Sequence, residues 1–257
     1  MKENSRFYSS LRLLIILNAI IKPVWIFGVD RLVQNSVGTM EYGTYFSLFN
    51  LSVVFSFLLD IGLTNYFNRQ LASKKENFIS HAGNFLFIKL LFLVLYIMIV
   101  CIAAWFTHIK RWDIVFGVIF IQAFQSLFVF FRGVITAHQW FHTDAWLSVL
   151  DKTLMILLCG SLLYLPSVFG TMSIDKFLYV QVSCAAMAMI CAFIILLKRK
   201  IHFSLSKILL FDKEIFRSAL PFAIIVLLMS VHYRLDGFLL ERINKNGAHQ
   251  AGVYAGA

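Results

Sequence analysis

Charged residues are scarce in this 257-residue chain. Asp, Glu, Lys and Arg make up 14% of the sequence, whereas an ordinary soluble domain has about 25%. Hydrophobic residues make up 60%, and the mean hydropathy is +0.80. A soluble core could not bury so much apolar surface, so the composition excludes a typical water-soluble domain and favours a protein of the lipid bilayer.

Acidic residues, metal-type cysteines and catalytic motifs are also in short supply. The 13 Asp and Glu are outnumbered by 23 Lys and Arg, for a net charge of +10. These cations lie mostly between apolar runs, a distribution that argues against nucleic-acid binding. The cysteines lie inside apolar runs without metal-type spacing, which argues against a disulfide framework or a zinc site: Cys101, Cys159, Cys184 and Cys191.

Phosphate-binding glycine loops, nucleophile elbows and paired catalytic carboxylates are absent from the sequence. We therefore expect no enzymatic activity, no cofactor and no metal. His138 and His142 have the i, i+4 spacing of a zinc pair, but no Glu follows the first in the metalloprotease manner. Because Trp140 lies between them, this turn is better interpreted as an anchor at the membrane interface.

Seven apolar runs approach the length of about 20 residues that a helix needs to cross a bilayer. They predict helices over 11–30, 41–68, 78–106, 113–137, 143–165, 175–197 and 216–240. The basic N-terminus resembles a signal peptide, but no small-residue cleavage site follows, so we assign it to the first helix. The predicted fold class is therefore an all-α integral membrane protein of about seven transmembrane helices.

Basic residues indicate how this chain is oriented. They gather before the first predicted helix and after the second and the sixth, while the other loops carry fewer. By the positive-inside rule, the N-terminus and the loops after helices two, four and six are cytoplasmic.

Two segments of the sequence share a pattern. Three residues after the first helix match three after the seventh at one constant offset: Gly38, Gly43 and Tyr45 with Gly247, Gly252 and Tyr254. This predicts a parallel repeat of six helices, as many transporters have. We expect residues 1–210 to form an N-terminal six-helix bundle and residues 211–257 to begin a second one. Since Ala257 falls inside the second helix of that repeat, we expect the chain to be part of a longer transporter.

Ionisable residues at membrane depth cost roughly 2.5–3.5 kcal/mol each on insertion scales, so they usually face a cavity or pair with one another. The sequence offers eight: Lys22, Asp60, Lys89, Arg132, Asp151, Lys152, Arg234 and Asp236. Cations predominate, which would give an aqueous cavity a positive potential suited to phosphate or acidic sugars. We interpret four as candidate anion-binding residues of this cavity: Lys22, Lys89, Arg132 and Lys152.

Other assignments of these charges remain open from the sequence. Arg132 lies near a helix end and could instead extend to the lipid headgroups. Lys22, beside Pro23, could form a buried ion pair with Asp60. Asp151 and Lys152 point about 100° apart on a helix, so we expect them not to satisfy each other. Asp60 and Asp151 are candidates for a coupling-ion site or a stabilising ion pair.

The sequence resembles a known family at short motifs. They are a Gly-x-x-x-x-Gly-x-Tyr entry to helix two, an Asp-x-Gly-Leu later in that helix, and a helix-seven Asp followed by Gly-x-Tyr. The residues are Gly38, Gly43, Tyr45, Asp60, Gly62, Leu63, Asp236, Gly252 and Tyr254. With these, the chain resembles the polysaccharide-exporter, or Wzx-type, flippases of the multidrug/oligosaccharidyl-lipid/polysaccharide superfamily.

The resemblance implies two six-helix bundles around a cationic cavity that opens alternately to each side of the bacterial inner membrane. The implied substrate is an undecaprenyl-pyrophosphate-linked oligosaccharide. The implied partners are membrane lipids and the polysaccharide polymerase and glycosyltransferases of the same pathway. Two alternatives are a cation-coupled multidrug antiporter of the same superfamily, which would need acidic residues to predominate in the bundle, and a membrane-embedded transferase, which would need a catalytic loop.

Overall fold

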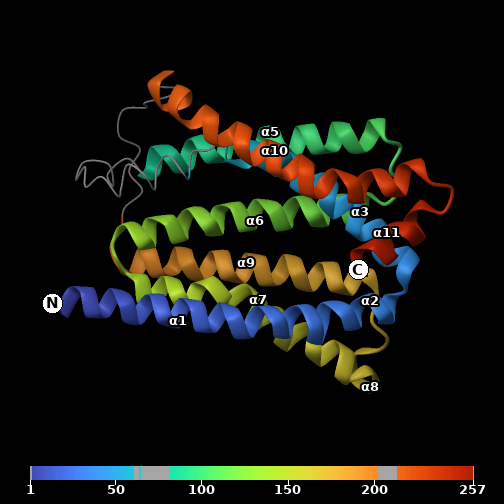
Figure 1. The fold of residues 1–257 in the computed structure, drawn as a ribbon, viewed down its shortest axis with the longest axis horizontal. Coiled ribbons are helices and arrows are strands. Elements are labelled where there is room, and N and C mark those ends of the chain that lie inside the picture. The colour runs from blue at the N-terminus through green and yellow to red at the C-terminus, as the bar shows by residue number, and fades with distance from the viewer. Residues whose placement is uncertain (1, 61–63, 65–81, 202–212, 257) are drawn as a thin grey trace.

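The computed structural model describes residues 2–60, 64, 82–201 and 213–256 (Figure 1). Within these residues, seven helices are long and apolar enough to cross a membrane. They are Tyr8–Val37, Thr39–Leu59, Ala82–Phe106, Trp112–Ala137, Phe141–Tyr164, Ile174–Lys198 and Leu220–Ile243. The prediction of an all-α membrane protein with about seven transmembrane helices is confirmed.

The first crossing is one long rod. It consists of α1 (Lys2–Trp25), a π-helical turn η1 (Ile26–Asp30) and α2 (Arg31–Val37). The rod passes the predicted end at residue 30 and stops at Gly38, whose φ of 92° is left-handed. Glycine tolerates this conformation, so Gly38 can turn the chain directly into the next helix.

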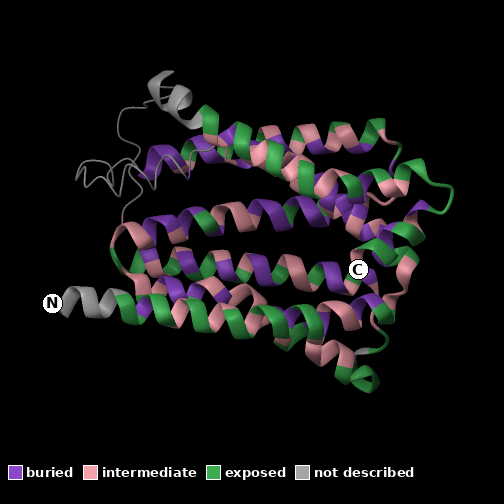
Figure 2. Ribbon diagram, viewed as in Figure 1, coloured by how far each residue is buried: buried purple, intermediate pink, exposed green. Residues whose placement is uncertain are grey.

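The second crossing comprises α3 (Thr39–Phe55) and a 3₁₀ turn η2 (Ser56–Leu59). The α-helical hydrogen bonding therefore ends earlier than the predicted limit at residue 68, and residues 61–63 and 65–68 lie outside the described part. In the most apolar window of this crossing 61% of the residues are buried, against 11% in the first crossing. Figure 2 shows the same contrast, so α3 is central and α1 peripheral.

Four further helices complete the N-terminal bundle: α5 (Ala82–Phe106), α6 (Trp112–Ala137), α7 (Phe141–Tyr164) and α9 (Ile174–Lys198), with a short α8 (Pro166–Phe169) before α9. Their bounds lie within a few residues of the predicted ones. Helix α1 packs on α7, and α6 packs on α9 (Figure 1). Small residues on α9, namely Cys184, Ala188 and Ala192, are fully buried, and they allow the close approach expected between membrane helices.

The C-terminal part consists of α10 (Lys213–Ile243) and α11 (Gly247–Gly256). Both helices pack mainly on α3 (Figure 1). The seventh predicted helix, 216–240, lies within α10. The predicted domain boundary at residues 210 and 211 falls outside the described residues, so it stays a prediction.

Helices α3 and α11 cross with their backbones in direct contact. A Cβ atom on Gly43 would overlap the carbonyl oxygen of Ala248, and one on Gly252 would overlap the carbonyl oxygen of Thr39. The offset that relates Gly43 to Gly252 also relates Thr39 to Ala248. The contact is therefore reciprocal, with each segment presenting the same two positions to the other.

Replacement of Gly43 by Ala should push α3 away from α11. The new methyl group would overlap the Ala248 carbonyl oxygen, and this backbone group cannot move aside without moving the helix. We expect a loss of about 1–3 kcal/mol, as for overpacked cores, measured as a lower midpoint of thermal unfolding in detergent. Gly160→Ala is the matched control, since a Cβ there meets no atom within 4 Å. Equal stability of the two variants would contradict the close crossing.

Candidate functional site

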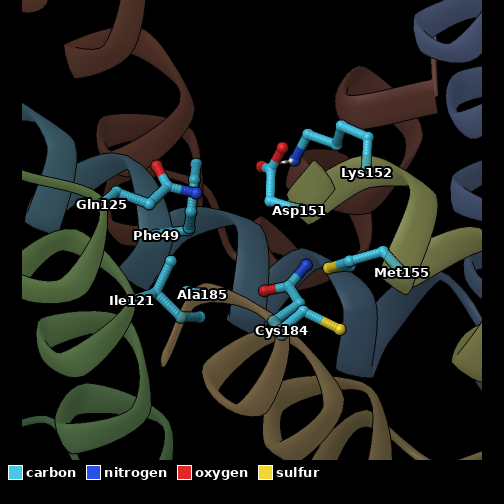
Figure 3. Close-up of a pocket in the computed structure, with 9 residues that line it drawn as sticks. Phe49, Ile121, Gln125, Asp151, Lys152, Met155, Cys184 and Ala185 are labelled. Carbon is cyan, nitrogen blue, oxygen red and sulfur yellow. Dashed lines mark ion pairs between the residues drawn. The ribbon is translucent and has the colours of Figure 1, made fainter. Parts of the chain in front are cut away.

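A small cavity with both apolar and polar lining residues lies between α3, α6, α7 and α9 (Figure 3). Its volume is about 50 Å³, and its lining residues are Phe49, Ile121, Gln125, Asp151, Lys152, Met155, Gln181, Cys184 and Ala185. Sites for drug-sized ligands measure roughly 300–1,000 Å³. This cavity has room for water but is too small for a saccharide in the present conformation.

Asp151 and Lys152 line this cavity together. The Nζ atom of Lys152 lies 3.5 Å from a carboxylate oxygen of Asp151 (Figure 3), so the expectation that these neighbours do not satisfy each other is wrong. The lysine side chain is long and flexible, so its ammonium group can bend back to the carboxylate although the two positions point about 100° apart on the helix. Lys152 also lies 5.3 Å from the centre of the Trp25 ring, at the end of α1, a distance at which a cation is attracted to an aromatic face.

Hydrogen bonds between helices surround the cavity. Tyr45 of α3 donates its hydroxyl to Gln181 of α9 at 2.7 Å. Beside it, the Tyr42 hydroxyl donates to Asp30 at 3.1 Å. These bonds join α3 both to the π-helical turn of the first rod and to α9, so the polar interior is held by three separate chain segments.

A second charged cluster lies where α3 ends and α5 begins. The Lys89 ammonium is almost fully buried and lies 2.6 Å from Asp60. The same carboxylate accepts hydrogen bonds from the backbone and hydroxyl of Thr64. Lys22, the alternative partner of Asp60, is exposed on α1 instead. Asp60 therefore pairs with the cation of the neighbouring helix.

Arg132 is held by a carboxylate that follows it across the turn between α6 and α7. Its Nε and Nη2 groups donate to the two oxygens of Asp144 at 2.6 and 3.1 Å. Asp144 is buried and Arg132 is partly exposed. A bidentate pair of this kind is strong and directional. In this conformation the Arg132 guanidinium is therefore bound to Asp144 and not to an external anion.

The described residues thus combine seven apolar helices with ion pairs inside and between them. The family described as polysaccharide biosynthesis protein matches the chain over residues 8–257. The chain belongs to this family. No curated protein and no solved structure matches it. As a polysaccharide biosynthesis protein, it is a multi-pass membrane protein of the exporter type.

The candidate cations of this protein occur mostly in neutral pairs. Of the four candidate anion-binding residues, Lys89, Arg132 and Lys152 are each within 4 Å of a carboxylate, and Lys22 has no such neighbour among the described residues. The excess of cations counted along the sequence is therefore locally balanced. Their role in binding an anion stays a prediction that requires these pairs to open.

Arg234 and Asp236, the two candidate membrane-depth charges of α10, contact other helices. Arg234 lies 3.4 Å from the side-chain oxygen of Asn50 on α3. Asp236 accepts a hydrogen bond from the hydroxyl of Tyr254 on α11. Arg234 thus links α10 to α3, and Asp236 links α10 to α11.

Sequence patterns missed three residues of these sites. Asp144 lies on the same predicted helix as Asp151 and Lys152, but its distance of 12 residues from Arg132 along the sequence gives no sign that the two pair. Asp30 falls at the predicted helix end, where a carboxylate is unremarkable. Trp25 looks like an ordinary apolar residue, and its contact with Lys152 depends on how α1 packs on α7.

Removal of the Asp60 carboxylate should leave the Lys89 charge buried without a counterion. We expect Asp60→Asn to cost about 3–5 kcal/mol, the range for breaking a buried ion pair. In the double variant Asp60→Asn with Lys89→Met, most of this loss should be recovered. Unfolding midpoints in detergent provide the measurement.

The matched control for this cycle is Asp175→Asn. Asp175 pairs with Arg111 at 2.6 Å, but both side chains are exposed. Exposed pairs contribute about 0.2–1 kcal/mol. If Asp60→Asn cost no more than Asp175→Asn, the Lys89 pair would not be the buried interaction described above.

Proposed function

We propose that this protein is a flippase that moves an undecaprenyl-pyrophosphate-linked oligosaccharide across the bacterial inner membrane for cell-surface polysaccharide biosynthesis. It works by alternating access, with the N-terminus in the cytoplasm. Family membership supports the link to polysaccharide synthesis. The seven crossings and their polar interior support a transport role rather than a chemical reaction.

The reciprocal crossing of α3 and α11 is the observation that carries the alternating-access mechanism. It lies at the end of the bundle away from the N-terminus (Figure 1). At the same end, Gln34 donates to the carbonyl of Gly252 at 2.6 Å, and Arg242 donates to the carbonyl of Thr107 at 2.8 Å. We infer that these contacts close the outer end between the two repeats.

Substrate binding on this proposal requires the cavity between the helices to expand. The Asp151–Lys152 pair is the candidate for opening, because its separation of 3.5 Å is the longest of the ion pairs named above. A pyrophosphate could then replace the Asp151 carboxylate as the partner of Lys152. Lys89 and Arg132 would add positive charge once their own ion pairs open, and Lys22 would do so once α1 turns it toward the cavity.

Coupling to an ion gradient would use the carboxylates that these cations release. Asp60 and Asp151 are the candidates, since a carboxylate that loses its cation at membrane depth favours binding a proton or a cation. During the cycle, each of these cations would exchange its carboxylate for the pyrophosphate, and each released carboxylate would bind a proton or a cation. Membrane lipids and the enzymes that build and polymerise the saccharide remain the proposed partners.

A cation-coupled antiporter of the same superfamily is the second candidate. Pairing of the cations with Asp60, Asp144 and Asp151 removes the basic predominance that argued against it. Asp30, hydrogen-bonded to Tyr42, adds another carboxylate to the interior. A membrane-embedded transferase is not favoured. It would need a catalytic His or carboxylate constellation on a loop outside the membrane, and the loops of this sequence are short.

Transport in liposomes distinguishes the two candidates. The reconstituted protein is offered a fluorescent lipid-linked oligosaccharide and a cationic dye in parallel. We expect movement of the saccharide lipid alone, with at least a tenfold loss in Lys152→Gln. Lys245→Gln, an exposed cation at the end of α10, serves as the control and should keep the wild-type rate. Movement of the dye alone would reject the flippase and favour the antiporter.

Opening of the outer end can be followed at Cys184, which lines the cavity and is fully buried. The other three cysteines are replaced by Ala, and a membrane-impermeant maleimide is added outside. Gln34→Leu removes the hydrogen bond to Gly252, so we expect several-fold faster labelling of Cys184. Ser36→Ala is the control, because Ser36 bonds within its own helix. Equal labelling rates in both variants would show that Gln34 does not hold this end closed.

A further inference from the structure

A Trp side chain joins the turn after α6 to the end of α9. The guanidinium of Arg199 lies 4.9 Å from the centre of a Trp140 ring. The His138 ring stacks on Trp140, also at 4.9 Å. Trp140 is half-buried, and both α6 and α9 end here, at the same end of the bundle (Figure 1). Trp at the end of membrane helices belongs to the level of the lipid headgroups.

Positive charge exceeds negative charge at this place. Both oxygens of Asp144, the carboxylate beside the turn, are taken by Arg132. Three consecutive cations, Lys198, Arg199 and Lys200, are exposed and have no carboxylate partner within the described residues. The two helix C-termini carry about half a negative charge each. They offset about one of the three positive charges, which leaves an excess available to an anion.

The backbone holds these cations in a defined turn. Lys200 has a φ of 57°, the left-handed conformation that glycine usually adopts after a helix. The amides of Lys200 and Ile201 bond back to the carbonyls of Leu197 and Leu196. A residue with a Cβ is disfavoured at such a position. Its presence keeps a third charge beside Lys198 and Arg199, at some cost to the local backbone.

An apolar strip leads away from the cations along α9. Met187, Ile190, Ile194 and Leu197 are exposed and follow one face of the helix at spacings of three and four. The three α9 residues that line the cavity, Gln181, Cys184 and Ala185, centre on a direction roughly 150° around the helix axis from this strip. The strip is therefore separate from the cavity in which the exported molecule is proposed to bind.

We propose that this helix end is a binding site for an anionic phospholipid. The site comprises His138, Trp140, Lys198, Arg199 and Lys200, and it receives the phosphate group. The acyl chain lies along the apolar strip of α9. A phospholipid combines the negative charge and the hydrocarbon that these two adjoining surfaces complement, whereas a free phosphate would leave the strip unused. The inference does not depend on the proposed transport activity.

Native mass spectrometry of the purified protein tests the site, with phosphatidylglycerol and phosphatidylcholine of identical acyl chains as the probes. We expect the first phosphatidylglycerol to bind at least fivefold more tightly than phosphatidylcholine. The variant Lys198→Gln with Arg199→Gln should bring the two lipids within twofold of each other. Lys245→Gln, an exposed cation at the other end of the bundle, should keep the wild-type preference.

The variant Lys200→Gly tests whether the charge of Lys200 contributes to lipid binding without weakening the fold. Glycine suits the left-handed turn, so this variant should unfold at the same temperature or higher while binding phosphatidylglycerol more weakly. Equal binding of both lipids by the wild type, or an unchanged preference in the variants, would overturn the proposal. So would competitive displacement of phosphatidylglycerol by a polyprenyl pyrophosphate, because the site would then belong to that lipid carrier.

Discussion

The bilayer interior requires that every charge placed in it be satisfied by the protein itself, and the polar organisation of this chain follows from that requirement. Hydrocarbon offers neither hydrogen bonds nor screening. Lys89, Arg132 and Lys152 accordingly each have a carboxylate within 4 Å. The pairs differ in geometry: the Lys89 ammonium is nearly inaccessible and Arg132 is gripped bidentately, whereas the Lys152 contact is longer and borders a cavity. A transport cycle would therefore act first on Lys152, and the Lys89 and Arg132 pairs would hold their helices together until the cavity has opened.

Helix α3 connects the elements of this architecture. One face contacts α10 and α11, while Tyr45 bonds to Gln181 and Ser52 bonds to Tyr96 on the opposite side. A shift of the C-terminal helices would reach the cavity through α3, since Phe49 of the same helix lines it. This explains why the most buried crossing also carries polar groups: each one is matched to a particular neighbour, so the helix can be both central and hydrophilic on several sides.

Helix positions were predictable from the sequence because the bilayer imposes a minimum length on each apolar run. Helix ends were less so: the first rod continues to Gly38, and α3 changes to a 3₁₀ turn before Asp60. The partners of the charges could not be predicted, because periodicity gives the face of a residue but not the height at which two helices meet. Asp60 thus pairs with Lys89 rather than Lys22, and Asp151 reaches Lys152 despite their angular separation.

The repeat pattern carried more information than its three matched residue pairs indicated. The same offset also relates Gly28 to Gly237, and a Cβ on Gly237 would overlap Asn50 of α3. In a two-fold contact, each position meets the partner's counterpart, as Thr39 and Gly43 do with Gly252 and Ala248. At this joint glycine meets backbone, and the Phe46 ring of α3 contacts the Tyr254 ring of α11 beside the crossing, so few long side chains must be ordered again when the joint closes. Such a contact suits an interface that opens and closes, whereas buried ion pairs suit the parts that move as units.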